Sequence, residues 1–372
     1  MMAAVGNEFR IPLRHLELAA KAWGDPADPP MLAVHGWLDN AGTFDRLAPL
    51  LKGHYVVAID LAGHGRSDHR PPGNWYPYVD FLDEIGEAMD QLGWQDADLL
   101  GHSLGATLVS VFAAICPQRV RRLLLIEGLG PIATAADQSL EQLRRSQRAR
   151  AAFRPDKLRV FNGLEEAVAV RRKVSELSLD AARCIVERGV KVVGAGSGGD
   201  EERSGTDASV VGGAKDQDRN GDPDSEGVQA LRHSTRNLAR SDNVPFEGGV
   251  AKVQKPGGDS EFERVQALHF LSWSSDPALT LPSSTRLTEE QLASILPAIT
   301  APTLLLLAEP AAPYLKREVM DARIALLDDI EVVRMSGSHH LHLEIPDLVA
   351  APIKDFLLNH PIEVSSAVQV AP

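Results

Sequence analysis

Gly101-His102-Ser103-Leu104-Gly105 is the stretch of sequence that decides the fold. It matches the pattern G-x-S-x-G, in which a serine lies on a sharp turn between a strand and a helix. The apolar segment 97–100 precedes it, and a helix-forming run, 106–116, follows it. Small residues on both sides let the strand and the helix approach without a Cβ clash. We therefore predict a nucleophile elbow with Ser103 at its tip, and an ordinary strand-to-helix turn is the alternative.

Short apolar segments recur through the first third of the chain and return near its end. They alternate with helix-like runs, which predicts an α/β fold: a mostly parallel central sheet with helices on both faces. An antiparallel pair is expected first, at 9–13 and 16–23. The other expected strands are 31–35, 55–60, 97–100, 120–126, 303–307 and 330–335, and the expected helices are 78–92, 106–116 and 346–358.

The strand rhythm stops after the segment that ends at Glu127. Helix-like runs rich in Arg, Glu and Ala follow, at 139–152, 164–176 and 179–188. A helical insertion between two parallel strands predicts a cap over the carboxyl edge of the sheet, where ligands bind in open α/β folds. The expected organisation is a core at 1–130, a helical cap at 131–298 and the rest of the core at 299–372.

Residues 194–260 are dense in Gly, Ser, Asp, Glu and Lys, and we expect this insert to be disordered. Within it, Asp216-Gln217-Asp218-Arg219-Asn220-Gly221 matches the start of an EF-hand calcium loop. The twelfth position is Gly227 instead of a bidentate Glu, and Pro223 interrupts the loop. A solvated acidic loop is therefore favoured over a calcium site, and neither a metal nor a cofactor is expected.

A serine nucleophile needs a base, and the base needs a third group to orient it. In one known order of such triads the histidine comes last, after the final strand. There the chain reads Ser336-Gly337-Ser338-His339-His340-Leu341-His342-Leu343-Glu344. His339 is the predicted base because it comes first and follows small residues that favour a tight loop. His340 is the alternative, and His342 is expected to pack or to face water.

The third member of the triad is less clearly marked. No aspartate follows the expected strand 303–307, where Glu309 is the only carboxylate. The other position for an orienting acid is the end of the strand 120–126, which is occupied by Glu127. A carboxylate that ends such an apolar run is costly unless it is paired. We therefore predict Glu127 as the acid, with Glu309 or no third member as alternatives.

Two hydrogen-bond donors are also needed for the oxyanion of a tetrahedral intermediate. The backbone N–H of Leu104, directly after the nucleophile, is the first candidate. The second is the N–H of Trp37, which follows Gly36 at the end of an expected strand. The alternative is that His35-Gly36 is only a strand-ending turn.

Three stretches together resemble the α/β-hydrolase superfamily: His35-Gly36-Trp37-Leu38-Asp39-Asn40, Asp60-Leu61-Ala62-Gly63-His64-Gly65-Arg66-Ser67, and the elbow. Within it, the first stretch, 339–344 and 273–282 are similar to the serine hydrolase-like proteins. The resemblance implies the α/β-hydrolase fold, with Ser103 as nucleophile, His339 as base and the Trp37 and Leu104 amides as oxyanion hole. A serine at the nucleophile position speaks against dehalogenase or epoxide hydrolase chemistry. The chain departs from the family pattern in the missing acid after Leu307 and in the insert.

These observations predict a cofactor-independent serine hydrolase that cleaves a small-molecule carboxylic ester or thioester through an acyl-enzyme. A non-catalytic small-ligand-binding protein on the same scaffold is the alternative. Trp273, Phe270 and Phe153 are candidates for an apolar acyl pocket, with core packing as the other interpretation.

The net charge, the apolar runs and the cysteine content limit the expected binding partners and cellular location. The net charge of −13 argues against a nucleic-acid partner. No apolar run is long enough to span a bilayer, and the first ten residues lack the apolar core of a signal peptide. Cys116 and Cys184 do not make a disulfide framework. We therefore expect a cytoplasmic protein, and the sequence does not indicate its oligomeric state.

Overall fold

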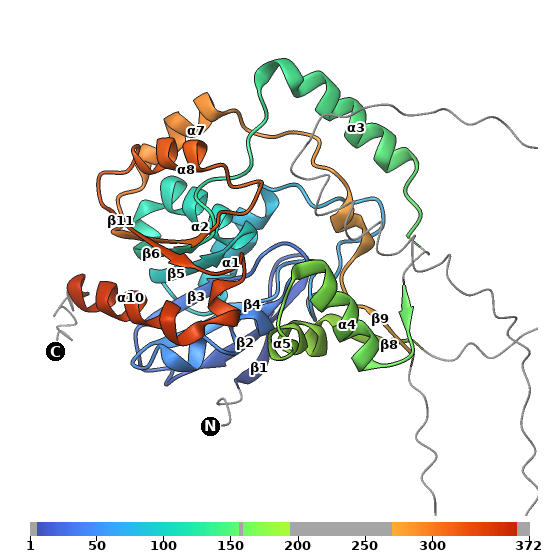
Figure 1. Ribbon diagram of the computed structural model, residues 1–372, viewed down its shortest axis with the longest axis horizontal. Helices are drawn as coiled ribbons and strands as arrows, with labels where there is room; N and C mark the ends of the chain where they lie inside the picture. Colours follow the sequence, from blue (N-terminus) through green and yellow to red (C-terminus); the bar gives the residue numbers. More distant parts are fainter. Residues whose placement is uncertain (1–5, 156–158, 194–269, 363–372) are drawn as a thin grey trace, which may run out of the picture.

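An eight-stranded sheet forms the centre of the computed structural model, which describes residues 6–155, 159–193 and 270–362 (Figure 1). The strand order is β1-β2-β4-β3-β5-β6-β10-β11. β2 pairs antiparallel with β1, as predicted, and also with β4, which was not predicted. Every other neighbouring pair is parallel, in keeping with the predicted mostly parallel sheet. The strands are Asn7–Pro12 (β1), Glu17–Trp23 (β2), Pro30–Val34 (β3), Tyr55–Ile59 (β4), Ala97–His102 (β5), Val120–Ile126 (β6), Thr303–Glu309 (β10) and Ile330–Ser336 (β11).

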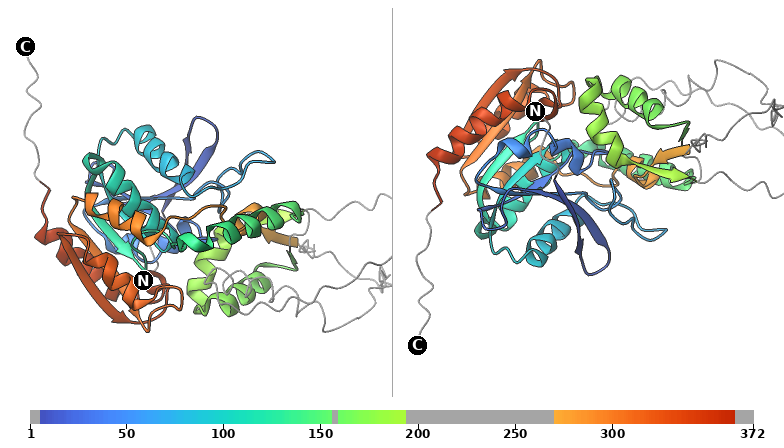
Figure 2. Two further views of the ribbon diagram at one scale, coloured as in Figure 1. Left: turned by 90° about the horizontal axis from the view of Figure 1, so that it is seen from above. Right: turned by 90° about the horizontal axis from the view of Figure 1, so that it is seen from below.

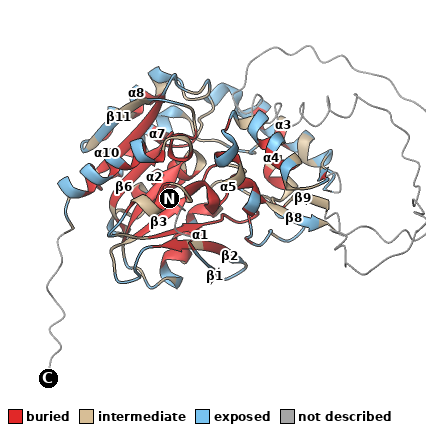
Figure 3. Ribbon diagram, turned by 60° about the horizontal axis from the view of Figure 1, so that its bottom comes forward, coloured by how far each residue is buried: buried red, intermediate tan, exposed pale blue. Residues whose placement is uncertain are grey.

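Successive residues of the central strands pack on opposite faces of the sheet. In β3, Leu32 and Val34 join one core cluster, and Met31 and Ala33 join the other. The first face packs against α1 (Asp80–Gln91), α2 (Leu104–Ile115), α7 (Glu289–Ile295) and α8 (Arg317–Ile324). The second packs against the short η1 (Ala41–Phe44) and η2 (Ala48–Leu50) and against α10 (Pro346–Asn359), which follows α9 (Leu341–Glu344). Figure 3 shows these strands buried between helices whose outer sides are exposed.

The described residues of 136–193 and 270–280, here called the insertion, lie to one side of the main sheet (Figures 1 and 2). They include α3 (Ser139–Ala151), α4 (Leu164–Ser175) and α5 (Leu179–Gly189). A three-stranded antiparallel sheet accompanies these helices, in the order β7-β9-β8. Its strands are Val160–Phe161 (β7), Val190–Val193 (β8) and Phe270–Trp273 (β9). The three helices were predicted, whereas the small sheet was not.

Three short α-helices of the described chain were also not predicted: α7, α8 and α9. α7 is defined by its first turn and not by apolar periodicity: Thr288 Oγ1 accepts from Gln291 N, and Gln291 Oε1 accepts from Thr288 N. The predicted disorder of 194–260 and the calcium-like stretch 216–221 lie outside the described residues. The domain boundaries near 130 and 298 stay a prediction.

None of the helices in the described part of the chain is long and apolar enough to cross a membrane.

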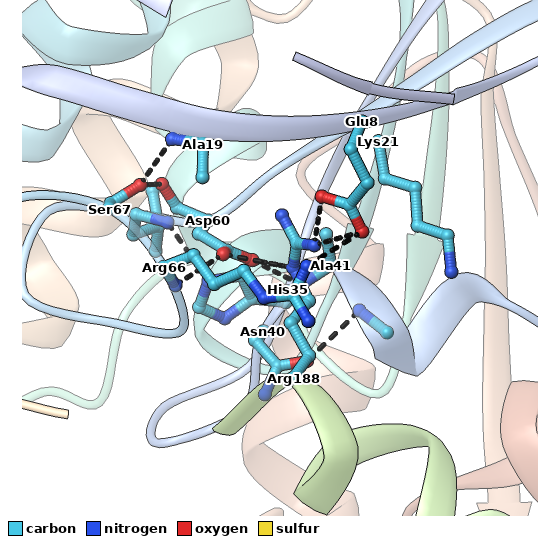
Figure 4. Close-up of polar contacts among 12 residues, drawn as sticks. Glu8, Ala19, Lys21, His35, Asn40, Ala41, Asp60, Arg66, Ser67 and Arg188 are labelled. Atoms are coloured by element: carbon cyan, nitrogen blue, oxygen red, sulfur yellow. Dashed lines mark hydrogen bonds and ion pairs between the residues drawn. The ribbon is translucent and has the colours of Figure 1, made fainter. Parts of the chain in front are cut away.

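A buried ion pair fastens the insertion to the main sheet (Figure 4). Arg188 of α5 donates from Nε to both carboxylate oxygens of Asp60, at 2.9 Å each, and Nη1 contacts Glu8 of β1. Asp60 is fully buried and also accepts from the amides of Ala41 and Arg66, at 2.7 Å each. Because both oxygens are saturated with donors, this charge is tolerated in the interior.

The end of β8 and the start of β9 face each other in the small sheet. We therefore predict that the described fold does not depend on the length of the chain that connects them. Val193 and Phe270 are directly opposite each other in the antiparallel register. A two-residue Asn-Gly turn spans such a pair, so replacing 194–269 by Asn-Gly is expected to leave the fold intact. Thermal unfolding followed by circular dichroism should show a Tm within about 4 °C of the full chain, or about 1 kcal/mol.

The matched control also removes β8, the edge strand that pairs with β9. This variant is expected to unfold at a clearly lower temperature. Loss of cooperative unfolding in the Asn-Gly variant itself would contradict the prediction.

Candidate active site

Ser103 lies on a strained turn between β5 and α2. Its backbone angles are φ 52° and ψ −116°, a region that residues other than glycine rarely adopt. The flanking glycines are required by contact. A Cβ on Gly105 would lie 1.9 Å from the carbonyl oxygen of Val34, and one on Gly101 would lie 2.5 Å from the Ala106 nitrogen. The strand, turn and helix predicted around Ser103 are therefore present, and the serine is held at the carboxyl end of the sheet.

Three of the predicted site residues follow the ends of parallel strands of the main sheet. Ser103 follows β5, Glu127 follows β6 and His339 comes three residues after β11. The strand ends are tied together by backbone hydrogen bonds: Ser103 N donates to Ile126 O, and Glu127 N to Leu306 O, each at 2.9 Å. Since parallel strands end at one edge of a sheet, the fold places these three residues at the same edge.

Glu127 and His339 are joined by a hydrogen bond of 2.9 Å between Oε2 and Nδ1. The other oxygen of Glu127, Oε1, accepts from the Ala308 amide at 2.5 Å, and the residue is 2% exposed. A proton on Nδ1 that is donated to Glu127 leaves a lone pair on Nε2 of the neutral ring. Neither His339 Nε2 nor Ser103 Oγ has a hydrogen-bond partner among the described residues.

The alternative site residues have other surroundings. Glu309 lies at the surface: its side chain is 48% exposed and lies 3.4 Å from Arg317. His340 Nε2 lies 3.4 Å from an oxygen of Asp39. His342 is fully buried, with Nε2 2.7 Å from the Thr43 hydroxyl. Of the candidate acids, Glu127 is therefore the one that the structure places against His339.

The turn after β3 lies against the nucleophile. Asp39 N donates to Gly36 O at 3.1 Å, which closes a tight turn with Leu38 at φ 58°. A Cβ on Gly36 would lie 3.2 Å from the Cβ of Ser103. The amides of Trp37 and Leu104 have no hydrogen-bond acceptor in the described part of the chain. The turn at Gly36 therefore lies close to Ser103, and an oxyanion hole formed by the two amides stays a prediction.

Backbone strain is concentrated at this site. The described chain has four non-glycine residues with positive φ, and three of them are Leu38, Ser103 and Glu127. Each such conformation costs of order 1–3 kcal/mol and persists only where the surroundings enforce it. Strain gathered at three strand ends around one serine is typical of a functional site.

The three candidates for an apolar acyl pocket, Trp273, Phe270 and Phe153, all lie in the insertion. Trp273 packs edge-on against Phe161, with ring centroids 4.9 Å apart, and Phe153 packs edge-on against Trp75 at 5.9 Å. Phe270 begins β9. Core packing thus accounts for the contacts of Trp273, and an acyl pocket at these residues stays a prediction.

Several residues around the site were not singled out from the sequence. Tyr314 lies edge-on to His339, with ring centroids 5.3 Å apart. Asp39 is 2% exposed and forms a buried ion pair with Arg171 of α4. The one signal that could have pointed to Asp39 is a carboxylate directly after a strand-ending glycine turn. Nothing in the sequence connects it to Arg171, which lies 132 residues away.

Histidines crowd around His339, and most of them are buried. The His102 ring lies 4.1 Å from His342 and 5.1 Å from His340. Burial, followed by repulsion from neighbouring histidines, lowers the pKa of His342 to about 3 and holds the pKa of His102 well below its usual range. Within the described ranges no group of three or more His, Cys, Asp or Glu side chains is arranged to hold a metal ion.

Known proteins share this arrangement of elements. The family model of the alpha/beta hydrolase fold matches residues 29–182. A solved structure of a hypothetical protein from Pseudomonas aeruginosa PAO1 superposes with a TM-score of 0.70 at 32% identity, covering 94% of this chain and 99% of that chain. The chain belongs to the α/β-hydrolase superfamily. The predicted superfamily and the α/β-hydrolase fold are thus confirmed, and the predicted cap over the carboxyl edge of the sheet stays a prediction.

Within this superfamily the chain resembles proteins named serine hydrolase-like protein. The one from Danio rerio is 30% identical over 202 residues, which are 52% of this chain and 61% of that protein. The one from Homo sapiens is 42% identical over 122 residues, which are 32% of this chain and 60% of that protein. The matched segments thus cover less than two thirds of either relative.

The buried histidines predict a loss of stability in acid. The pKa of His35 is lowered to about 4, and those of His64 and His342 to about 3, chiefly by burial. The unfolded chain, in which a histidine titrates near 6.5, therefore binds more protons below that pH. The free energy of unfolding should fall as the pH drops from about 6.5 to 4, by up to about 1.4 kcal/mol per pH unit for each histidine.

Urea denaturation at pH 7 and pH 5 checks this expectation. Between pH 7 and pH 5, the free energy of unfolding should fall by about 2 kcal/mol less in His342→Gln than in the wild type. His15→Gln, which changes an exposed ring, is the control and should lose as much as the wild type. Equal losses in all three proteins would refute this account of the buried histidines.

Proposed function

We propose that this chain is a serine hydrolase that cleaves a small-molecule carboxylic ester or thioester through an acyl-enzyme. The observation that carries the proposal is the hydrogen bond between His339 Nδ1 and Glu127 Oε2, beside a strained serine at the next strand end. Nucleophile, base and orienting acid are the three parts that such chemistry requires. The names of the serine hydrolase-like relatives support the same class.

Acylation begins when His339 Nε2 takes the proton from Ser103 Oγ as this oxygen attacks the substrate carbonyl carbon. Glu127 stabilises the imidazolium that forms and keeps Nδ1 protonated. The carbonyl oxygen becomes an oxyanion, to which the amides of Trp37 and Leu104 donate hydrogen bonds. When the tetrahedral intermediate collapses, His339 returns the proton to the leaving alcohol or thiol.

Deacylation repeats these steps with water. His339 Nε2 removes a proton from the water molecule as its oxygen attacks the acyl carbon, and the same two amides stabilise the second oxyanion. Collapse of this intermediate breaks the bond to Ser103 Oγ, which recovers its proton from His339. The carboxylic acid leaves, and every group returns to its starting protonation state.

A fluorophosphonate probe tests the nucleophile directly because it bonds covalently to an activated serine. The wild type should be labelled at Ser103 and should hydrolyse p-nitrophenyl butyrate, whereas Ser103→Ala should show no labelling and a rate lower by roughly 10⁴-fold or more. Ser294→Ala, on the exposed side of α7, is the control and should keep both properties. A folded wild type that takes up no probe would instead favour the non-catalytic binding protein.

The acid is tested by paired substitutions of the two candidate carboxylates. Glu127→Gln keeps the shape but removes the charge that orients His339, so kcat should fall by roughly 10³- to 10⁴-fold. Glu309→Gln should leave kcat unchanged within a factor of about two, since its side chain is exposed and faces Arg317. Steady-state kinetics with the same ester decides between them, and the reverse pattern would assign the role to Glu309.

A further inference from the structure

The turn that carries the Trp37 amide is bonded to the insertion on two sides. Trp37 Nε1 donates to Leu279 O at 2.9 Å, in the short η5 (Pro277–Thr280). On the other side, Arg171 of α4 donates from Nη1 to Leu38 O at 3.4 Å and from Nη2 to an oxygen of Asp39. The bonds from Arg171 fall on the two residues that directly follow Trp37.

This turn needs an external restraint because its conformation is unfavourable by itself. Leu38 has a φ of 58°, which brings its Cβ too close to the neighbouring backbone. The turn is closed by one internal backbone hydrogen bond, from Asp39 N to Gly36 O at 3.1 Å. The contacts from Arg171 fix the Leu38 carbonyl and the Asp39 side chain, and therefore fix the plane of the strained peptide.

Asp39 connects the turn to both halves of the proposed catalytic machinery. Its second oxygen lies 3.4 Å from His340 Nε2 and 3.7 Å from His102 Nδ1. His340 is next to His339 in the chain, and His102 precedes Ser103 and lies 2.9 Å from the His339 carbonyl oxygen through Nε2. A single buried carboxylate thus contacts the neighbours of the base and of the nucleophile.

The charge of Asp39 depends on Arg171. Burial by itself raises the pKa of this carboxyl group, but Arg171 and then His340 outweigh it and hold the pKa well below its usual range. Asp39 is 2% exposed and Arg171 is 8% exposed, so solvent does not screen the pair. Removing the guanidinium would leave a buried carboxylate facing two histidines.

We propose that Arg171 is a positioning residue through which the packing of the insertion sets the oxyanion-binding turn. The inference rests on the proposed function above. Arg171 does not touch the reacting atoms, because its two terminal nitrogens are engaged by Leu38 and Asp39. The planar fork of a guanidinium suits this task, since it reaches two acceptors in fixed geometry, whereas a lysine supplies a point charge.

The test compares R171Q and R171K with the wild type, using p-nitrophenyl butyrate and a phenyl trifluoromethyl ketone. The ketone forms a hemiketal whose oxyanion occupies the same position as that of the tetrahedral intermediate. We expect kcat to fall roughly 10- to 100-fold in R171Q and about 10-fold in R171K, with KM changed by less than about threefold. The affinity for the ketone should weaken by the same factor as kcat.

R188K is the matched control because Arg188 also joins the insertion to a buried carboxylate, Asp60, without contacting the turn at 36–39. It should lower Tm as much as R171K does but keep kcat within about twofold, as expected for a loss of stability alone.

Two results would overturn the inference: folded Arg171 variants with wild-type kcat and ketone affinity, or an equal fall of kcat in R188K. If R171Q does not fold, R171K decides, since it keeps the positive charge against Asp39. A wild type that neither hydrolyses the ester nor takes up the fluorophosphonate would overturn the proposed function itself, which separates the two failures.

Discussion

A carboxylate persists in the interior of a protein only when both of its oxygens are paired, and Glu127 meets this condition where three strands end. One oxygen accepts from the Ala308 amide of β10, and the other contacts His339 beyond β11. The carboxylate therefore joins the ends of β6, β10 and the loop after β11. The position of Ser103 depends on the same strand end, because the Ser103 amide donates a hydrogen bond to the carbonyl oxygen of Ile126, the residue before Glu127.

Much of this arrangement could be predicted from local sequence. The elbow is encoded by glycines that no other residue could replace, as the contact of Gly105 with Val34 shows. Glu127 could be predicted because a charged residue at the end of an apolar strand requires a partner. The small sheet of the insertion could not, since β7 has two residues and β8 and β9 have four each, too short to show an alternating pattern.

The contacts between the insertion and the core could not be predicted from the sequence either, for a different reason. Arg171 reaches Asp39 across 132 residues, and Arg188 reaches Asp60 across 128. Each arginine lies on a helix with several other charged residues, and nothing local distinguishes a buried guanidinium from an exposed one. Only the packing of α4 and α5 onto the core selects these two, and with them the surroundings of the turn after β3.

The position of Glu127 has a consequence for the segment between β10 and α8. Because the carboxylate that holds His339 follows the inner strand β6, the orienting charge of the proposed base does not come from the segment between Pro310 and Lys316. Its side chains, among them Tyr314 beside the imidazole, are free to diverge while the Glu127–His339 contact stays intact. Under the proposed mechanism, proton transfer and the lining of this rim belong to separate parts of the chain, so that selection can alter one without disturbing the other.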